Sequence, residues 1–332
     1  MNPPKISEFD YINFLVAAQR AFTCTEASRS QPEGMNNAAH DAFTRLLQKN
    51  PLDTDALWNE AKQLVRLDDG ILVVDDTTLD KPYAENMDLV TLHWSGKHHR
   101  VVKGINLVST LWTDGRALIP CDFRVYDKPF GGKGKNDHFR DMLIKAKERG
   151  FKPLYVLLDS WYAGLDNLKI ISRTLGWHWL ARLKSNRLAN LDRKGNVSIS
   201  SIEIPTQGRV VHLKGYGFVK VFKTVSSEGD VEYYATDKLG MKEKEYDELA
   251  GKGWGVEVYH RGIKQCCGVE RSQARKAIKQ INHIMLSLRA FLRLELHRLR
   301  TGISWYEAKI SMIRPAIRSY MSNPSLVFGP TA

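Results

Sequence analysis

The stretch Ile71-Leu72-Val73-Val74-Asp75-Asp76-Thr77-Thr78-Leu79 decides how the chain is organised. Its first four residues are apolar and mostly β-branched, which predicts a strand in the middle of a sheet. A charged side chain is costly there unless it is paired or binds a metal ion. Asp75 and Asp76 are therefore either site residues or the start of an Asp-Asp-Thr-Thr turn that ends the strand, because carboxylates are also common in turns.

The segments after this strand predict a β-meander followed by alternating helices and strands. In chain order we expect strands over 103–111 and 117–125, a helix over 136–150, a strand over 154–158, a helix over 165–175 and a strand over 177–183. This order of elements is similar to that of a ribonuclease H-like core, an analogy at the level of the fold that does not by itself establish activity.

Three other regions flank or interrupt this core. Residues 1–70 predict short helices, and residues 184–240 predict a β-rich insertion of short alternating runs. Residues 241–332 read as helical throughout, and they would complete the core that begins at 71–183. The predicted fold class is therefore α/β, a ribonuclease H-like mixed sheet with a β-rich insertion and helical regions at both ends.

Composition and charge limit the classes of partner. The net charge of +12 favours a polyanion such as nucleic acid. Residues 1–70 hold 7 Lys and Arg against 10 Asp and Glu, or −3, whereas residues 258–320 hold 13 against 3, or +10. We therefore expect the polyanion to contact the C-terminal part.

The same composition argues against zinc and membrane classes. The four cysteines show no spacing typical of a structural zinc site. We find neither an apolar signal segment nor an apolar run long enough to cross a bilayer, so we expect no membrane partner and a cytoplasmic protein, at the nucleoid when it acts on DNA.

Two further carboxylates stand at predicted element boundaries. Asp159 ends the strand Val156-Leu157-Leu158, where it is also a plausible helix N-cap, and Glu257 lies on a predicted helix, where a solvated glutamate is common. Together with Asp75 they would bring three oxygen donors to one point, a set that suits Mg²⁺ or Mn²⁺. Two such ions can support phosphodiester displacement.

These motifs resemble the DDE transposases of bacterial insertion sequences. The resemblance rests on Val73-Val74-Asp75-Asp76-Thr77, on the segment from Val156 to Gly164 with Asp159, and on Trp254-x-x-Glu257 with Lys264 seven positions after the glutamate. Asp76-Thr77-Thr78 fits the first motif as well, and Asp75 is preferred because its Thr is nearer to the strand. The sequence departs from the family signature at Ala250 and Gly253, where the family has Tyr and Arg.

The resemblance implies an enzyme that cleaves DNA at the ends of a mobile element and joins these ends to target DNA. Asp75, Asp159 and Glu257 would be catalytic and would hold Mg²⁺ or Mn²⁺, as two ions. The partners would be double-stranded DNA, as terminal inverted repeats and as target, and a second copy in a homodimer. The N-terminal helices would recognise the DNA end or make dimer contacts.

The resemblance and the charge pattern also suggest DNA contacts. Lys264 would contact a phosphate, His260 and Arg261 would replace the missing signature contacts, and Trp254 either stacks on an unpaired base or packs against a helix. Arg271, Arg275 and Lys279 are four residues apart, which predicts one basic helical face, continued by Arg289, Arg293 and Arg300, that contacts phosphates or only solvent.

Two other functions remain open. A ribonuclease H-like structure-specific nuclease would cut without joining strands, and a domesticated DNA-binding protein would have lost catalysis. The complete carboxylate set argues against the latter, and inverted repeats beside the gene would distinguish the transposase from both.

Overall fold

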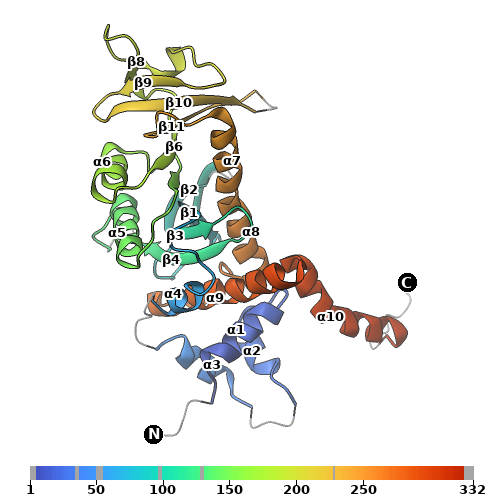
Figure 1. Cartoon of the computed structure of the whole chain (residues 1–332). Helices are drawn as coiled ribbons and strands as arrows, with labels where there is room; N and C mark the ends of the chain where they lie inside the picture. Colours follow the sequence, from blue (N-terminus) through green and yellow to red (C-terminus); the bar gives the residue numbers. More distant parts are fainter. Residues whose placement is uncertain are drawn as a thin grey trace, which may run out of the picture. The chain divides into compact units, whose positions relative to one another are not determined.

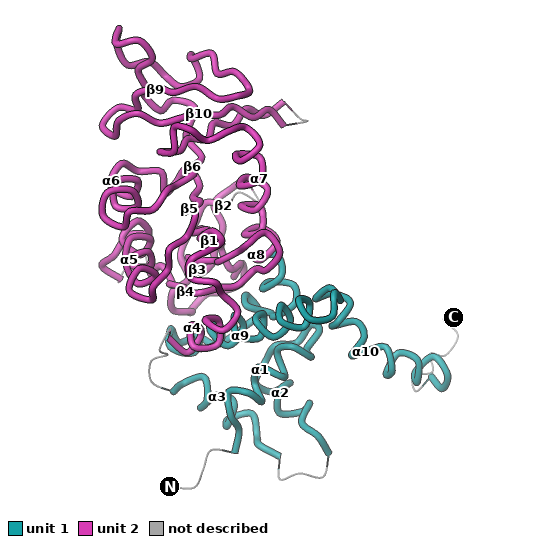
Figure 2. The backbone as a smooth tube through the Cα atoms, viewed as in Figure 1, with its two compact units in different colours: residues 1–52, 261–332 teal, residues 53–260 magenta. Residues whose placement is uncertain are grey.

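The computed structural model describes residues 5–33, 37–49, 55–95, 99–127, 131–226 and 229–324. The chain divides into two compact units, which Figure 2 shows in two colours. Unit 1 comprises residues 1–52 and 261–332, and unit 2 comprises residues 53–260. The N-terminal and C-terminal segments of the sequence therefore fold together, and the segment between them forms a unit of its own.

Unit 2 is built on one mixed sheet, which has 11 strands in the described part of the chain. The strands are β1 (Ile71–Asp80), β2 (Thr91–Ser95), β3 (Arg100–Thr113), β4 (Ile119–Tyr126), β5 (Tyr155–Leu158), β6 (Trp179–Leu183), β7 (Leu188–Asn190), β8 (Val197–Ser198), β9 (Arg209–Leu213), β10 (Gly217–Val225) and β11 (Val231–Thr236). They follow the order β2-β3-β1-β5-β6-β11-β10-β9-β7-β8, and β4 also pairs with β3.

The core of this sheet confirms the predicted ribonuclease H-like fold. Strands β1, β3 and β4 form an antiparallel meander, and β5 and β6 lie parallel to β1 on its other side. Four-residue strand β5 is buried throughout, which explains why it reads as a continuous apolar run. The crossover helices α5 (Lys135–Glu148) and α6 (Leu165–Lys169), the latter extended by a π-helical turn at Ile170–Thr174, lie on one side of the core strands (Figure 1).

Strand β1 does not end at its carboxylates. Its ladder with β3 continues from Ile71, opposite Thr113, to Asp80, opposite Gly104. The alternative of an Asp-Asp-Thr-Thr turn is therefore wrong, because these residues stay hydrogen-bonded in the sheet. Asp75 and Asp76 are successive strand residues, so their side chains leave opposite faces of the sheet.

The β-rich insertion extends the core sheet. Strand β11 pairs antiparallel with β6, with Tyr233 opposite Leu183, and β10, β9, β7 and β8 follow outward from it. Within this insertion, β8 is only two residues long, and residues 199–201 then make a 3-10 turn. The insertion is consequently positioned by hydrogen bonds to the strand that follows the crossover helix.

The remaining helices of unit 2 are α4 (Asp55–Ala61), α7 (Glu243–Gly253) and the first part of α8 (Gly255–Cys267), of which residues up to His260 belong to this unit. Helices α7 and α8 lie on the face of the core strands opposite α5 and α6 (Figure 1). The core sheet is thus covered by helices on both faces.

Unit 1 is helical. It contains α1 (Glu8–Ala17), α2 (Cys24–Arg29), α3 (His40–Leu46), α9 (Ala277–Thr301) and α10 (Trp305–Ser322). Buried polar contacts join its distant parts: the Tyr11 hydroxyl lies 3.0 Å from His283 Nδ1, and Lys309 Nζ donates to the carbonyls of Val16 and Ala18, each at 2.7 Å. These bonds tie α1 to the C-terminal helices.

Candidate active site

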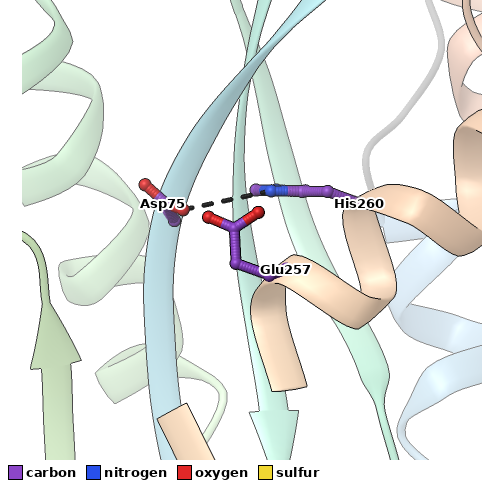
Figure 3. Close-up of side chains that lie close together, drawn as sticks. All are labelled: Asp75, Glu257 and His260. Atoms are coloured by element: carbon purple, nitrogen blue, oxygen red, sulfur yellow. Dashed lines mark ion pairs between the residues drawn. The ribbon is translucent and has the colours of Figure 1, made fainter. Parts of the chain in front are cut away.

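Strand β1 and helix α8 bring together three side chains of the types that bind metal ions. Ligand atoms of Asp75, Glu257 and His260 all lie within 4.8 Å of one another. Figure 3 shows the Asp75 carboxylate on its strand, facing both side chains of the helix. Glu257 and His260 are three residues apart, so they share one face of α8. The structure therefore places Asp75 close to Glu257, although the two residues are 182 positions apart in the sequence.

Two glycines let this helix begin close to the sheet. A Cβ on Gly253 would lie 2.9 Å from Leu157 Cδ2, and one on Gly255 would lie 2.7 Å from Leu118 Cδ2. A larger side chain at either position would require the leucine to move or the junction of α7 and α8 to shift away from the strands. At Gly253, where the family signature has arginine, a side chain would require Leu157 to move.

The structure distinguishes between the two adjacent aspartates. Asp76 accepts hydrogen bonds from Asn106 at 2.6 Å, from Tyr162 at 2.7 Å and from Lys135, with which it also forms an ion pair, at 2.7 Å. Burial alone would raise the pKa of Asp76, but these three partners together hold it below its usual value. Asp76 thus has a complete set of structural partners, whereas Asp75 faces Glu257 and His260.

Asp159 lies beside Asp75 in the sheet but outside the 4.8 Å group. Leu158 of β5 pairs in parallel with Val74 of β1. The residues that follow them, Asp159 and Asp75, therefore lie at the same level along the two neighbouring strands. Asp159 Oδ1 accepts hydrogen bonds from the backbone of Trp161 at 2.8 Å and Tyr162 at 3.4 Å. Asp159 caps this turn and is not the N-cap of the next helix, which begins six residues later at Leu165.

The negative charges are crowded. Burial raises the pKa of Asp75 well above its usual value, and the charges of Asp76, Asp159 and Glu257 raise it further. Burial and the charge of Asp76 also raise the pKa of Asp159. Ionised carboxylates at this density are unfavourable without a counter-charge. The donor set and its electrostatics therefore fit a divalent cation.

The expected DNA-contacting residues lie in different settings. His260 is 5% exposed, with its Nδ1 3.9 Å from Asp75 Oδ2, so it lies in the carboxylate cluster and away from the surface. Trp254, in contrast, is 63% exposed at the end of α7. In unit 1, Arg261 is exposed and Lys264 is partly buried.

The expectation of one basic helical face is wrong. Helix α8 ends at Cys267, and α9 begins only at Ala277, so exposed Arg271 and Arg275 lie in the connecting segment and only Lys279 is helical. Gly268 breaks the helix: its φ is +62°, and a Cβ there would lie 2.5 Å from the Phe22 ring.

Two arginines of the expected basic face make structural contacts within unit 1. Arg289 is 5% exposed and forms an ion pair with Glu8 of α1. Arg293 lies over the Phe9 ring, 5.4 Å from its centroid, and donates to the carbonyl of Arg289 at 2.8 Å. Helix α9 is therefore largely buried, and Arg300 at its end is exposed.

Sequence reasoning missed the place of His260 among the carboxylates. It also missed the group of Asn106, Lys135 and Tyr162 that holds Asp76. The spacing of three residues between Glu257 and His260 on a predicted helix would have indicated that His260 lies on the same helix face as Glu257. The group around Asp76 has no local sequence pattern, because its members lie 30, 59 and 86 positions from Asp76 in the sequence.

Comparisons with known proteins give a family match and similar solved structures. The transposase DDE domain family matches residues 66–293. The piggyBac transposase synaptic complex with hairpin DNA has a TM-score of 0.50 and 9% identity, covering 97% of this chain and 84% of that chain. The Drosophila P element transposase strand transfer complex has a TM-score of 0.33 and 8% identity, covering 96% and 86%.

No curated protein sequence matches the chain. Among the described residues, no helix is long and apolar enough to span a membrane. The family match covers the core strands, the insertion and the helices that carry the site. The chain therefore belongs to the DDE-domain transposase family and is a DNA transposase.

Proposed function

We propose that this transposase cuts phosphodiester bonds at the ends of a mobile element and joins the ends to target DNA, with Asp75, Asp159 and Glu257 as its catalytic carboxylates. The observation that carries the proposal is the convergence of Asp75 and Glu257 beside Asp159 within the family's domain. Both reactions are in-line attacks on phosphorus, first by water and then by a DNA 3′-hydroxyl, so one site serves both.

The three carboxylates would hold Mg²⁺ or Mn²⁺, as two ions, which activate the attacking oxygen and stabilise the leaving oxygen. Asp75 and Asp159 approach from adjacent strands, and Glu257 approaches from α8. His260 would either donate a nitrogen ligand or orient Asp75. Lys135 pairs with Asp76, whose negative charge still raises the pKa of Asp75 and Asp159.

The DNA partners would be terminal inverted repeats and target DNA. Arg261, Arg271 and Arg275 are exposed cations of unit 1 and would contact phosphates, with Lys264 and Lys279 as partly buried additions. Replacing Arg271 or Arg275 by Ala should weaken binding about equally on all sequences and reduce the log–log salt slope by roughly one unit per contact. A loss restricted to certain sequences would indicate base contacts instead.

We further propose a homodimer through α10. Tyr306, Ile310, Ile313, Ile317 and Tyr320 follow the 4-3-4-3 spacing of a coiled-coil seam, and all but Ile313 are at least 40% exposed. Glu307 and Arg314 flank this seam on the same side and pair with each other at 2.6 Å. In an antiparallel pair of α10 helices, Glu307 of one copy would meet Arg314 of the other, which gives a second copy both apolar and charge complementarity.

The proposed reaction is tested with purified protein, Mg²⁺, target plasmid and labelled DNA from the inverted repeats that flank the gene. A transposase nicks the end DNA and also joins precleaved ends to the plasmid. Nicking without joining would contradict the proposal and favour a structure-specific nuclease. DNA binding without either reaction would indicate a domesticated, inactive protein.

A further inference from the structure

Strand β3 carries buried hydroxyl groups beside the carboxylate cluster. In this largely apolar strand, the buried polar side chains are Asn106, Ser109, Thr110 and Thr113. Asn106 donates to Asp76, and the Thr113 hydroxyl accepts a hydrogen bond from the backbone of Gly115 at 2.9 Å. The hydroxyls of Ser109 and Thr110 are inaccessible to solvent and make no hydrogen bond with any described residue. A buried hydroxyl without a partner destabilises a fold, and alanine or valine would fill the same space without this cost.

Ser109 lies directly opposite Asp75 in the sheet. Side chains at paired positions of antiparallel strands point to the same face, with their Cβ atoms about 4.5–5.5 Å apart. The other near neighbours of Ser109 on this face are Leu107 and Leu111 along β3 and Phe123, which lies opposite it on β4. These three are apolar, so among these neighbours Asp75 is the one that can accept a hydrogen bond.

Within the described residues, Asp75 has fewer hydrogen-bond partners than the other aspartates of the site. Its Oδ1 accepts from the backbone of Asp76 at 2.8 Å, and its Oδ2 lies 3.9 Å from His260 Nδ1, beyond hydrogen-bond distance. Asp76 by comparison has three side-chain donors, and Asp159 has two backbone donors. Carboxylates that hold a metal ion are themselves fixed by hydrogen bonds. Asp75 therefore lacks a donor where Ser109 lacks an acceptor.

We propose that Ser109 is a positioning residue of this site: its hydroxyl donates to the Asp75 carboxylate and fixes the orientation in which Asp75 binds a divalent cation. An ionised carboxylate has about four lone-pair sites, so Asp75 can accept this bond and still coordinate a metal ion. Both side chains are short and adjacent, so a change between staggered rotamers brings the hydroxyl to the carboxylate. This inference rests on the proposed function, because it takes Asp75 as a metal ligand.

Thr110 provides a matched control on the other face of the sheet. It follows Ser109 in β3, is 1% exposed and lies opposite Val74 and Asp122. Successive strand residues point to opposite faces, so the Thr110 hydroxyl cannot reach Asp75. Ser109→Ala and Thr110→Val therefore each remove one buried hydroxyl, but only the first removes it from the face of the carboxylate cluster.

The test measures Mn²⁺ binding, with free Mn²⁺ counted from its electron paramagnetic resonance signal. Ser109→Ala should bind Mn²⁺ at least about tenfold more weakly than the wild type, the loss typical when a metal ligand loses its own hydrogen-bond partner. Thr110→Val should bind Mn²⁺ as the wild type does. Asp75→Asn, which alters the ligand itself, gives the loss expected when the site fails.

Urea unfolding in EDTA distinguishes positioning from support of the fold. Without metal, removal of a hydroxyl that has no partner breaks no hydrogen bond. Ser109→Ala should therefore have an unfolding midpoint equal to or above that of the wild type. A hydroxyl that only supported the fold would lower the midpoint when it is removed.

Unchanged Mn²⁺ binding by Ser109→Ala would overturn the inference, and so would a loss of binding that comes with a lowered midpoint in EDTA. An equal loss in Thr110→Val would also overturn it, because the effect would then not depend on the face of the sheet. If Asp75→Asn loses Mn²⁺ binding and Ser109→Ala does not, only this inference fails. If the wild type binds Mn²⁺ no better than Asp75→Asn, the proposed metal site fails and the inference fails with it.

Discussion

Asp75 Oδ2 and His260 Nδ1 lie 3.9 Å apart, so a buried imidazole stands beside the most crowded carboxylate of the site. Imidazole is a better ligand for transition metals than for Mg²⁺, which prefers oxygen. If His260 is a ligand, the wild type should be more active with Mn²⁺ than with Mg²⁺.

We therefore predict that His260→Ala lowers strand transfer about tenfold with Mn²⁺ and less with Mg²⁺, in the range found for outer contacts of metal sites. The measurement is the initial rate of joining of precleaved ends at saturating concentrations of each metal. An equal loss with both metals would indicate that His260 only orients Asp75.

The adjacent aspartates should have opposite effects on stability. Asp75→Asn removes a buried carboxylate that three other carboxylates repel, so the metal-free protein should gain roughly 1–2 kcal/mol in free energy of unfolding. Asp76→Asn weakens a partly buried ion pair with Lys135 and two hydrogen bonds, so it should cost about 1–3 kcal/mol.

Urea titration in EDTA compares these variants. Added Mn²⁺ should raise the melting temperature of the wild type, and it should do so much less for Asp75→Asn. If Asp75→Asn destabilised the protein, Asp75 would not be repelled by its neighbouring carboxylates. If Mn²⁺ raised the melting temperature of this variant as much as that of the wild type, Asp75 would not be a metal ligand.

Close packing at Gly255 should be needed for activity. Gly255→Ala places a Cβ 2.7 Å from Leu118 Cδ2, which should displace the start of α8 and Glu257 with it. We expect strand transfer to fall about 10²-fold, the loss typical of a misplacement of about 1 Å.

Gly251 provides the matched control. A Cβ there meets nothing within 4 Å, so Gly251→Ala should keep activity and add about 0.5–1 kcal/mol of stability. Combining Gly255→Ala with Leu118→Ala should restore part of the rate, and a failure to restore any would contradict the steric explanation.

The dimer proposal predicts a difference between two faces of α10. Ile310→Asp/Ile317→Asp should convert the protein to monomers in analytical ultracentrifugation, because charges on the seam oppose its burial. Met312 is as exposed as Ile317, at 46% each, but lies off the seam, so Met312→Asp should not change the mass. A dimer that survives the double substitution would exclude α10 as the interface.

Local patterns in the sequence predicted most of the core. The apolar run at 71–74, the crossover helix at 136–150 and the strand before Asp159 all formed near their expected bounds. The two buried strands read as continuous apolar runs, and the helix shows one apolar face at helical spacing. The hypothesis that Asp75, Asp159 and Glu257 converge came from their positions at predicted element boundaries, and the family resemblance strengthened it. The structure places Asp75 with Glu257, and Asp159 one strand away.

The features that sequence did not predict depend on distant contacts. The break between α8 and α9 follows from the packing of Gly268 on Phe22. Arg289 was expected on the DNA-binding face, but it forms an ion pair with Glu8, which is 281 residues away in sequence. The short strands β2 and β7 were also not predicted, because three to five residues carry little periodicity. Tertiary packing, not local propensity, decides such positions.

The central claim is that Asp75, Asp159 and Glu257 act as one metal site for both cleavage and joining. The most direct measurement is strand transfer of precleaved, labelled element ends into a plasmid by Asp159→Asn and Glu257→Gln, with Mn²⁺ and Mg²⁺, alongside end-DNA binding in EDTA. We predict that both variants bind the ends as the wild type does, because phosphate-contacting cations supply that affinity, and that both fail to join them, with at most partial rescue by Mn²⁺. Full strand transfer by Glu257→Gln would contradict the account, since Glu257 would then not be the third carboxylate of the site.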